Sequence, residues 1–286
     1  MVSVAEPLSS GTSGTSVPLI DRVVRWSGWT LAGSVWASGA VFGLYMLLFF
    51  GGTALHGTLD RWNESLDFLH PANAPSATAG IGVHFLAGGL LLILGPLQLM
   101  GSIRRAYPAL HRWLGRIYVA AAGIAGVGGL VFILVAGTIG GPVMNVGLAG
   151  YGVLVTLCSV KAYTEAQARR FERHRAWAIR LFSLVVGSWL FRIDYGFWFM
   201  IAGKVGHTHL FRGPFDYFMD FFFYLPNLVV AELFIRTRRM APHSALKAGA
   251  AAVLVTASAF VLTASFYFAV QFWVPGMVSG VTGAPL

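Results

Sequence analysis

The chain has 286 residues, of which 56% are hydrophobic and only 11% charged, and its formal net charge is +9. A soluble domain carries about 25% charged residues, so this composition excludes an ordinary soluble enzyme and indicates an integral membrane protein. The basic residues fall between long apolar runs, which fits orientation in a lipid bilayer and argues against nucleic acid as a partner.

The N-terminal 20 residues are rich in Ser, Gly and Thr and contain no apolar stretch. They predict a disordered tail at 1–20, followed by a single transmembrane domain at 21–286. The first apolar run extends from about Trp29 to Phe50. Because about 20 residues cross a hydrocarbon layer of about 30 Å, this run predicts an uncleaved anchor helix.

Six further apolar runs follow, and their charged connections predict the topology. The approximate limits of the runs are 80–101, 113–138, 143–163, 176–202, 215–235 and 247–273. Lys and Arg gather before the first run and after the second, fourth and sixth, and they are sparse in the alternate connections. The positive-inside rule therefore predicts an all-α polytopic bundle of about seven transmembrane helices in the inner (plasma) membrane, with the N-terminus cytoplasmic and the C-terminus outside.

Glycines and prolines inside the runs predict how the helices pack and bend. Many of the 35 glycines lie within helical segments, where small residues let helix backbones approach closely in lipid. Pro96 and Pro226 lie inside the second and sixth runs. We expect them to kink these helices, because proline lacks the N–H group that a helix interior needs.

Two His-Arg turns, HRWLGRI at 111–117 and HRAWAIRL at 174–181, each follow a basic connection and open an outward-going helix. They suggest two related hairpins that form a four-helix core. Helix N-termini favour anions, so these turns predict a cytoplasmic anion-binding cluster of Arg112, Arg116, Arg175 and Arg180. The alternative is that these arginines only set topology and meet lipid phosphates.

Several polar residues lie within the predicted spans, where they are costly and usually face the bundle interior. One face of the second helix carries His84, Gly88, Leu91, Gly95 and Gln98 at helical spacing, which predicts packing against another helix or a flat ligand.

Charged residues in the fifth and sixth helices predict a polar network. Arg192 and Asp194 lie in the outer half of the fifth helix, and we expect Arg192 to pair with Asp216 or Asp220. Glu232 is the expected counter-charge for the cytoplasmic arginines. These pairs could equally serve only to hold the helices together.

A series of motifs runs through the core at residues 80–236. They are His84, Gly88-Gly89, Gly95-Pro96, Gln98, Arg104, His111-Arg112, Gly115-Arg116, Tyr118, His174-Arg175, Trp177, Arg180, Arg192, Pro226-Asn227 and Ala231-Glu232. With these motifs the core resembles the bacterial membrane proteins grouped as domain of unknown function 2306, and Ala178 departs from the family pattern, which has methionine there. The resemblance implies a membrane-helical fold and no established activity.

Three functions remain open at this point. The first is a redox protein that binds haem b between His111 and His174, with Arg112 or Arg175 near the propionates, His84 serving a second site or a proton path, and a membrane redox partner. The second is a non-redox carrier or intramembrane enzyme that binds an anionic or phosphate group at the cytoplasmic cluster. The third is a structural accessory subunit. The sequence contains no nucleotide-binding or metal motif of high specificity, and the His207-Thr-His209 pair is a weak metal signal.

Overall fold

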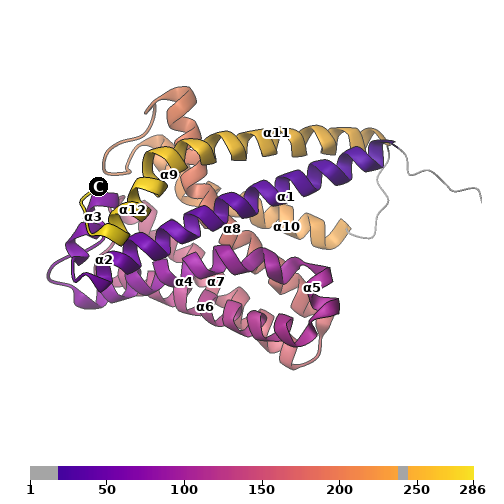
Figure 1. Ribbon diagram of the computed structural model, residues 1–286, viewed down its shortest axis with the longest axis horizontal. Helices are drawn as coiled ribbons and strands as arrows, with labels where there is room; N and C mark the ends of the chain where they lie inside the picture. Colours follow the sequence, from indigo (N-terminus) through magenta and orange to yellow (C-terminus); the bar gives the residue numbers. More distant parts are fainter. Residues whose placement is uncertain (1–18, 238–243) are drawn as a thin grey trace, which may run out of the picture.

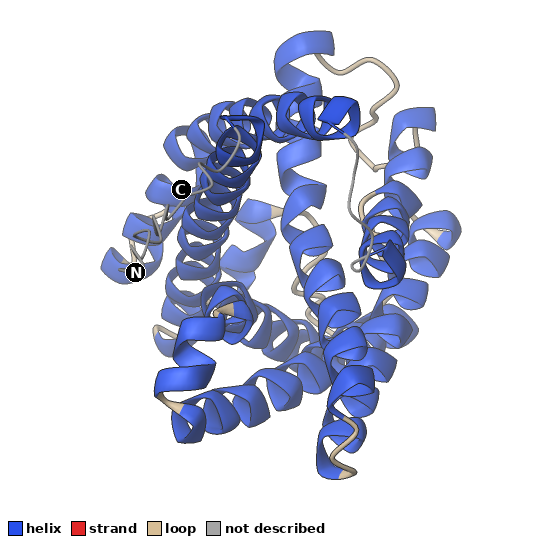
Figure 2. Ribbon diagram, turned by 90° about the vertical axis from the view of Figure 1, so that its right-hand side faces the viewer, coloured by secondary structure: helices blue, strands red, loops and turns tan. Residues whose placement is uncertain are grey.

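The computed structural model describes residues 19–237 and 244–286, and the regular structure within these ranges is entirely helical (Figure 2). Seven helical segments are long and apolar enough to cross a membrane. The predicted all-α transmembrane bundle is thereby confirmed. Of the predicted tail, residues 1–18 lie outside the described ranges, whereas Leu19 and Ile20 already belong to the first helix.

Twelve α-helices and three short helical turns make up the described chain. In order they are α1 (Leu19–Tyr45), a π-helical turn (Met46–Phe50), α2 (Gly51–Leu55), a 3-10 turn (Leu59–Arg61), α3 (Trp62–Ser65), α4 (Pro75–Leu99), α5 (Gly101–Ala106), α6 (Pro108–Val135), α7 (Pro142–Gln167), α8 (Phe171–Ala202), α9 (Pro214–Phe222), α10 (Leu225–Thr237), α11 (Ser244–Phe268), a π-helical turn (Ala269–Trp273) and α12 (Val274–Thr282).

The helix ends differ from the predicted limits where charged or small residues continue a helix. The first span begins at Leu19 rather than Trp29, because Arg22 and Arg25 extend the helix beyond the apolar run. The last span continues through α12 to Thr282. The sixth span is interrupted between α9 and α10, where Pro226 is the second residue of α10. A proline there needs no N–H partner, so it favours a fresh helix start over a kinked continuation.

Four helices form the core that positions the polar residues. The packed pairs are α4 with α6, α6 with α7, α7 with α8 and, less extensively, α4 with α8, so α6 and α8 lie diagonally opposite. Figure 1 shows α1 and α11 side by side along one edge of the bundle, and α1 also packs on α4. The four core helices are those of the two predicted hairpins.

Close backbone contact between α4 and α6 depends on glycine. A Cβ atom added to Gly80 would lie 2.7 Å from the carbonyl oxygen of Gly128, and one added to Gly128 would lie 2.5 Å from that of Gly80. Neither backbone oxygen can move without shifting its helix. These two glycines therefore set the separation of α4 and α6, as small residues do between membrane helices.

The C-terminal helix is tied to the connection between α2 and α4 by Arg61, whose side chain is almost fully buried. Its guanidinium donates hydrogen bonds to the carbonyl oxygens of Gly283 (3.0 Å) and Ala284 (2.5 Å) and to Ser279 Oγ (2.5 Å). It also binds Glu64 through two contacts of 3.0 and 3.2 Å. The hydrogen bonds from Arg61 lower the pKa of Glu64, so the ionised carboxylate is the form that takes part in this hydrogen-bonded cluster.

Candidate functional site

His84 lies on the face of α4 that points into the four-helix core. Its Nδ1 atom lies 2.8 Å from the carbonyl oxygen of Ala125 on α6. A carbonyl oxygen can only accept a hydrogen bond, so Nδ1 carries the proton and Nε2 of the neutral ring is left with a free lone pair. Nε2 has no hydrogen-bond partner among the described residues. The sequence therefore located an inward-facing histidine whose second nitrogen is available as an acceptor.

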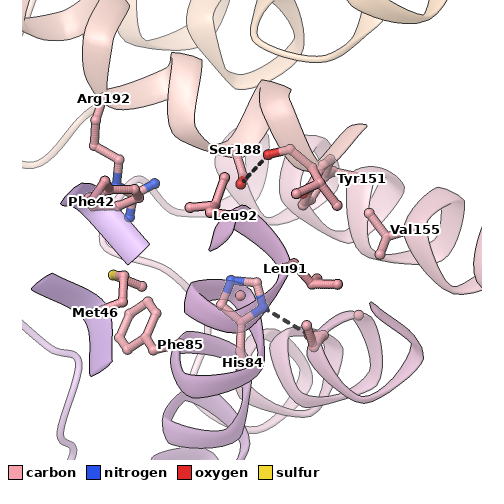
Figure 3. A pocket seen from close by; sticks show the side chains of 14 residues that line it. Phe42, Met46, His84, Phe85, Leu91, Leu92, Tyr151, Val155, Ser188 and Arg192 are labelled. Atoms are coloured by element: carbon pink, nitrogen blue, oxygen red, sulfur yellow. Dashed lines mark hydrogen bonds between the residues drawn. The ribbon is translucent and has the colours of Figure 1, made fainter. Parts of the chain in front are cut away.

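A cavity adjoins His84 between α1, α4, α6, α7 and α8 (Figure 3). It offers about 40 Å³ to the centres of water-sized molecules, whereas a single water needs about 10–15 Å³ on that measure. The cavity therefore holds a few waters or one small polar group. It is lined by Phe42, Met46, His84, Phe85, Gly88, Leu91, Leu92, Ala125, Gly126, Tyr151, Val155, Val185, Ser188 and Arg192.

Arg192 borders the same cavity and has no ion pair with any residue in the described ranges. Its guanidinium carbon lies 5.5 Å from the centre of the Phe42 ring and 5.7 Å from that of Phe191. In Figure 3 the side chain reaches toward Phe42, and His84 lies across the cavity. Ring faces attract a cation but do not neutralise it, so Arg192 brings an uncompensated positive charge to the cavity.

The expected pairing of Arg192 with Asp216 or Asp220 is wrong, because Asp216 is already saturated. Its fully buried carboxylate accepts hydrogen bonds from Tyr195 Oη (2.8 Å), His207 Nδ1 (2.7 Å), Thr208 N (3.0 Å) and Gly213 N (2.8 Å). These bonds hold the loop between α8 and α9 and cap α9.

The remaining acidic residues of the predicted network stand apart from the cavity. Asp220 is also fully buried, and neither of its carboxylate oxygens has a partner in the described chain. Asp194 and Asp220 do not line the cavity. The cavity therefore brings His84 and Arg192 together without an acidic partner.

The two histidines of the His-Arg turns occupy the first turns of α6 and α8, at what we call the basic end of the bundle, the end that carries α5 and these N-termini. His174 Nδ1 lies 2.8 Å from the carbonyl oxygen of Ala162 on α7, so its Nε2 also carries a lone pair in the neutral ring. His111 lies within electrostatic range of His174, Arg104 and Arg112. Its buried Nδ1 has no partner in the described chain.

The four arginines predicted to form one anion site differ in their contacts and exposure. Arg180 is engaged by Glu232, at 2.6 and 3.0 Å, and its guanidinium stacks 4.8 Å above the Trp177 ring. Arg116 is exposed and lies over Trp113 of its own helix at 5.7 Å. Arg112 is exposed and Arg175 is partly buried. Glu232 is thus the counter-charge of Arg180, as expected, and it also binds Arg236.

Sequence reasoning missed Tyr151 and Ser188 of the cavity, and it named Tyr118 only as a motif residue without a role. Tyr151 lines the cavity, donates to the carbonyl oxygen of Leu184 at 3.2 Å and is hydrogen-bonded to Ser188 (Figure 3). Tyr118 is 6% exposed, and its hydroxyl has no partner in the described chain. A usable signal for Tyr118 was its position seven residues after His111, which places both on one face of α6.

The predicted outer histidine pair does not act together. His207 is bound to Asp216 by its Nδ1 atom, whereas His209 is exposed and lies 3.5 Å from Asp67. Within the described ranges, no three His, Cys, Asp or Glu residues come close enough together to hold a metal ion.

Comparison with known proteins gives one match. A family model described as "Predicted membrane protein (DUF2306)" matches residues 81–235. No curated protein and no solved structure matches the chain. The matched segment contains His84, Tyr151 and Arg192 of the cavity, whereas Phe42 of α1 and Met46 of the following π-helical turn lie outside it.

Proposed function

The chain belongs to the DUF2306 family of predicted membrane proteins, and from that premise we propose that it binds an acidic amphipathic molecule in the cavity between His84 and Arg192. The observation that carries the proposal is the guanidinium of Arg192, which lines this cavity without an ion pair in the described chain. A charged side chain within a membrane span costs about 3 kcal/mol or more and marks a functional site by default.

The polar groups of the cavity favour an oxygen acid as the ligand head. Arg192 supplies several N–H donors in a fixed fork that matches a carboxylate. His84 Nε2 supplies an acceptor, because its Nδ1 proton is committed to Ala125. A carboxylic acid or phenol can donate its proton to His84 and then receive hydrogen bonds from Arg192. A neutral ester or a cation lacks this match.

The remaining walls favour an apolar body attached to that acidic head. Apolar groups come from all five helices that surround the cavity and from the π-helical turn after α1. They are Phe42, Met46, Phe85, Leu91, Leu92, Ala125, Tyr151, Val155, Val185 and the stem of Arg192. The space available accommodates the head group rather than the whole molecule, so the body is expected to extend along the helices toward lipid.

Photoaffinity labelling with a diazirine-bearing fatty acid, compared with its methyl ester, tests this proposal on the purified full-length protein. We expect the acid to label peptides that contain Phe42, Met46 or Leu91. The ester should label them at least about tenfold less, because one lost charged hydrogen bond is worth about 1.5–3 kcal/mol.

Two variants complete the design. Arg192→Gln should reduce labelling by the acid to the level of the ester, whereas Arg105→Gln, at an exposed position on α5, should leave labelling unchanged. Equal labelling by acid and ester, or undiminished labelling of Arg192→Gln, would refute the proposal.

A second candidate, a redox protein with haem b held by His111 and His174, is favoured by one separate observation. The Nδ1–H of His174 is committed to a backbone carbonyl, which is how ligating histidines are commonly oriented with Nε2 toward a metal. His111 lies on the diagonally opposite helix within electrostatic range, and Arg112 and Arg175 adjoin the two histidines in sequence. A bound haem would supply one-electron transfer.

The absorption spectrum of the protein purified after haem-supplemented expression decides this second candidate. A haem Soret band that is lost in His111→Ala and in His174→Ala, and retained in His84→Ala, would support it. A spectrum without the band contradicts it.

We also propose that the basic end faces the cytoplasm and that the chain lies in the plasma membrane, because arginines concentrate at that end.

A further inference from the structure

Three buried polar atoms between the cavity and the basic end have no hydrogen-bond partner in the described chain: Tyr118 Oη, Gln98 Nε2 and His111 Nδ1. Buried polar atoms in folded proteins are nearly always satisfied, by protein or by ordered water. Leaving a buried polar group unpaired costs about 1–3 kcal/mol, so three such groups in one region point to bound water.

The three side chains lie along the contact between α4 and α6, and we call this line of polar groups the column. A Cβ atom added to Gly95 would lie 3.3 Å from the ring of Tyr118 and 3.2 Å from that of Phe182, and one added to Gly115 would lie 3.2 Å from Gln98 Oε1. Gly115 stands one helical turn after His111 and one before Tyr118. From the basic end inward, the three polar side chains therefore follow one another at intervals of about one turn.

Tyr118 is the member of the column nearest to the cavity. It lies within electrostatic range of Tyr151, and Tyr151 lines the cavity together with His84. On α4, His84 and Gln98 are separated by 14 positions, or about 21 Å along the helix axis. Leu92 also lines the cavity and stands six positions, or about 9 Å, from Gln98. The cavity therefore occupies the part of this distance next to His84, and the column occupies the part next to the basic end.

We propose that water fills this column and that it conducts protons between the basic end and His84. Nε2 of neutral His84 accepts a proton from the adjoining water or from an acidic ligand, and the return step releases it to the same water chain. The Tyr118 hydroxyl passes a proton by donating its own to one water and accepting another, so it is unchanged after each transfer. This proposal does not depend on the identity of the ligand. It goes beyond the proposed function because it connects the cavity, for proton transfer, to the basic end and not to the opposite end of the bundle.

A single thiol in the cavity provides the test. Cys158 is the only cysteine of the chain, so Gly88→Cys in a Cys158→Ala background places one thiol beside His84, where a Cβ atom meets no other atom within 4 Å. Because only the thiolate reacts, its rate of modification by membrane-permeant methyl methanethiosulfonate reports the pH that the cavity senses. The protein is reconstituted into vesicles with a different pH on each side.

Sidedness is assigned with Arg105→Cys, an exposed position at the basic end, and a membrane-impermeant thiol reagent. We expect the Gly88→Cys rate to follow the pH on the side of Arg105, by about tenfold per pH unit below the thiol pKa, and to ignore the opposite side. Adding Tyr118→Leu should reduce this response at least about tenfold, because it replaces the hydroxyl that passes the proton with an apolar side chain.

The matched control is Leu181→Ile, which should leave the response intact. Leu181 is 1% exposed and lies ten positions into α8, as Tyr118 lies ten positions into α6. The proposal is overturned if the rate follows the opposite side, follows both sides equally, or is unchanged by Tyr118→Leu. Since no ligand is added, failure here is independent of failure to bind a fatty acid.

Discussion

The two buried carboxylates of α9 allow the hydrogen-bond assignment to be tested quantitatively. Asp216 and Asp220 are both fully buried on the same short helix, but Asp216 accepts four hydrogen bonds and Asp220 none from the described chain. In Asp216→Asn one carboxylate oxygen becomes an NH2 group, so two of the four bonds are lost. At about 1.5–3 kcal/mol for each bond to a charged group, the expected cost is about 3–6 kcal/mol.

The same substitution at Asp220 provides the control. Asp220→Asn removes a buried charge without breaking a bond to any described residue, so we expect a loss below about 1 kcal/mol or a gain in stability. Thermal unfolding of both variants in the same detergent measures the difference. At roughly 2 °C per kcal/mol, Asp216→Asn should unfold at least about 4 °C below Asp220→Asn. Equal unfolding temperatures would show that the four contacts do not hold the loop between α8 and α9.

Gly80→Ala should destabilise the protein by about 1–3 kcal/mol, because its Cβ would lie 2.7 Å from a backbone oxygen of α6, whereas Gly33→Ala, which meets no atom within 4 Å, should be neutral or stabilising in the same unfolding assay. Glu64 has a lowered pKa in the folded protein. Its stabilising effect is therefore present above its ordinary pKa and is lost as the pH falls through the lowered value. Between about pH 5 and 3, the unfolding temperature of the wild type should fall more than that of Glu64→Gln. Glu232→Gln should lower the free energy of unfolding by only about 1 kcal/mol or less, since the side chains of Glu232 and Arg180 are 33% and 24% exposed. A larger loss would indicate that water is excluded from this ion pair.

The number and type of helices could be predicted from the sequence because lipid imposes a length on each apolar run. The helix ends could not, because a helix continues through charged residues that leave the hydrocarbon. Arg22 and Arg25 extend α1 outward in this way. The break between α9 and α10 shows a related limit, since Pro226 signals disruption of a helix but not whether the chain bends or restarts there.

The site was partly predictable for the same kind of reason. Helical spacing was enough to predict the inward face of α4, and His84 lies on the cavity as that face required. The partner of Arg192 was not predictable, because the sequence offered both Asp216 and Asp220 at a similar expected depth in the membrane. Asp216 instead accepts N–H groups of its own loop, which are close in the chain and need no long side chain to reach them.

The distribution of unsatisfied polar groups separates folding from function in this bundle. Every buried side-chain atom without a partner in the described chain belongs to a residue between Gln98 and Asp220, inside the segment that matches the family. The outer helices α1 and α11 instead satisfy their polar groups, as Ser38 does with Trp189 and Ser265. Selection for stability alone would remove unpaired groups everywhere, since each costs about 1–3 kcal/mol. Their confinement to the family segment, which also contains the uncompensated charge of Arg192, therefore argues that this part of the bundle is built to receive water or a ligand.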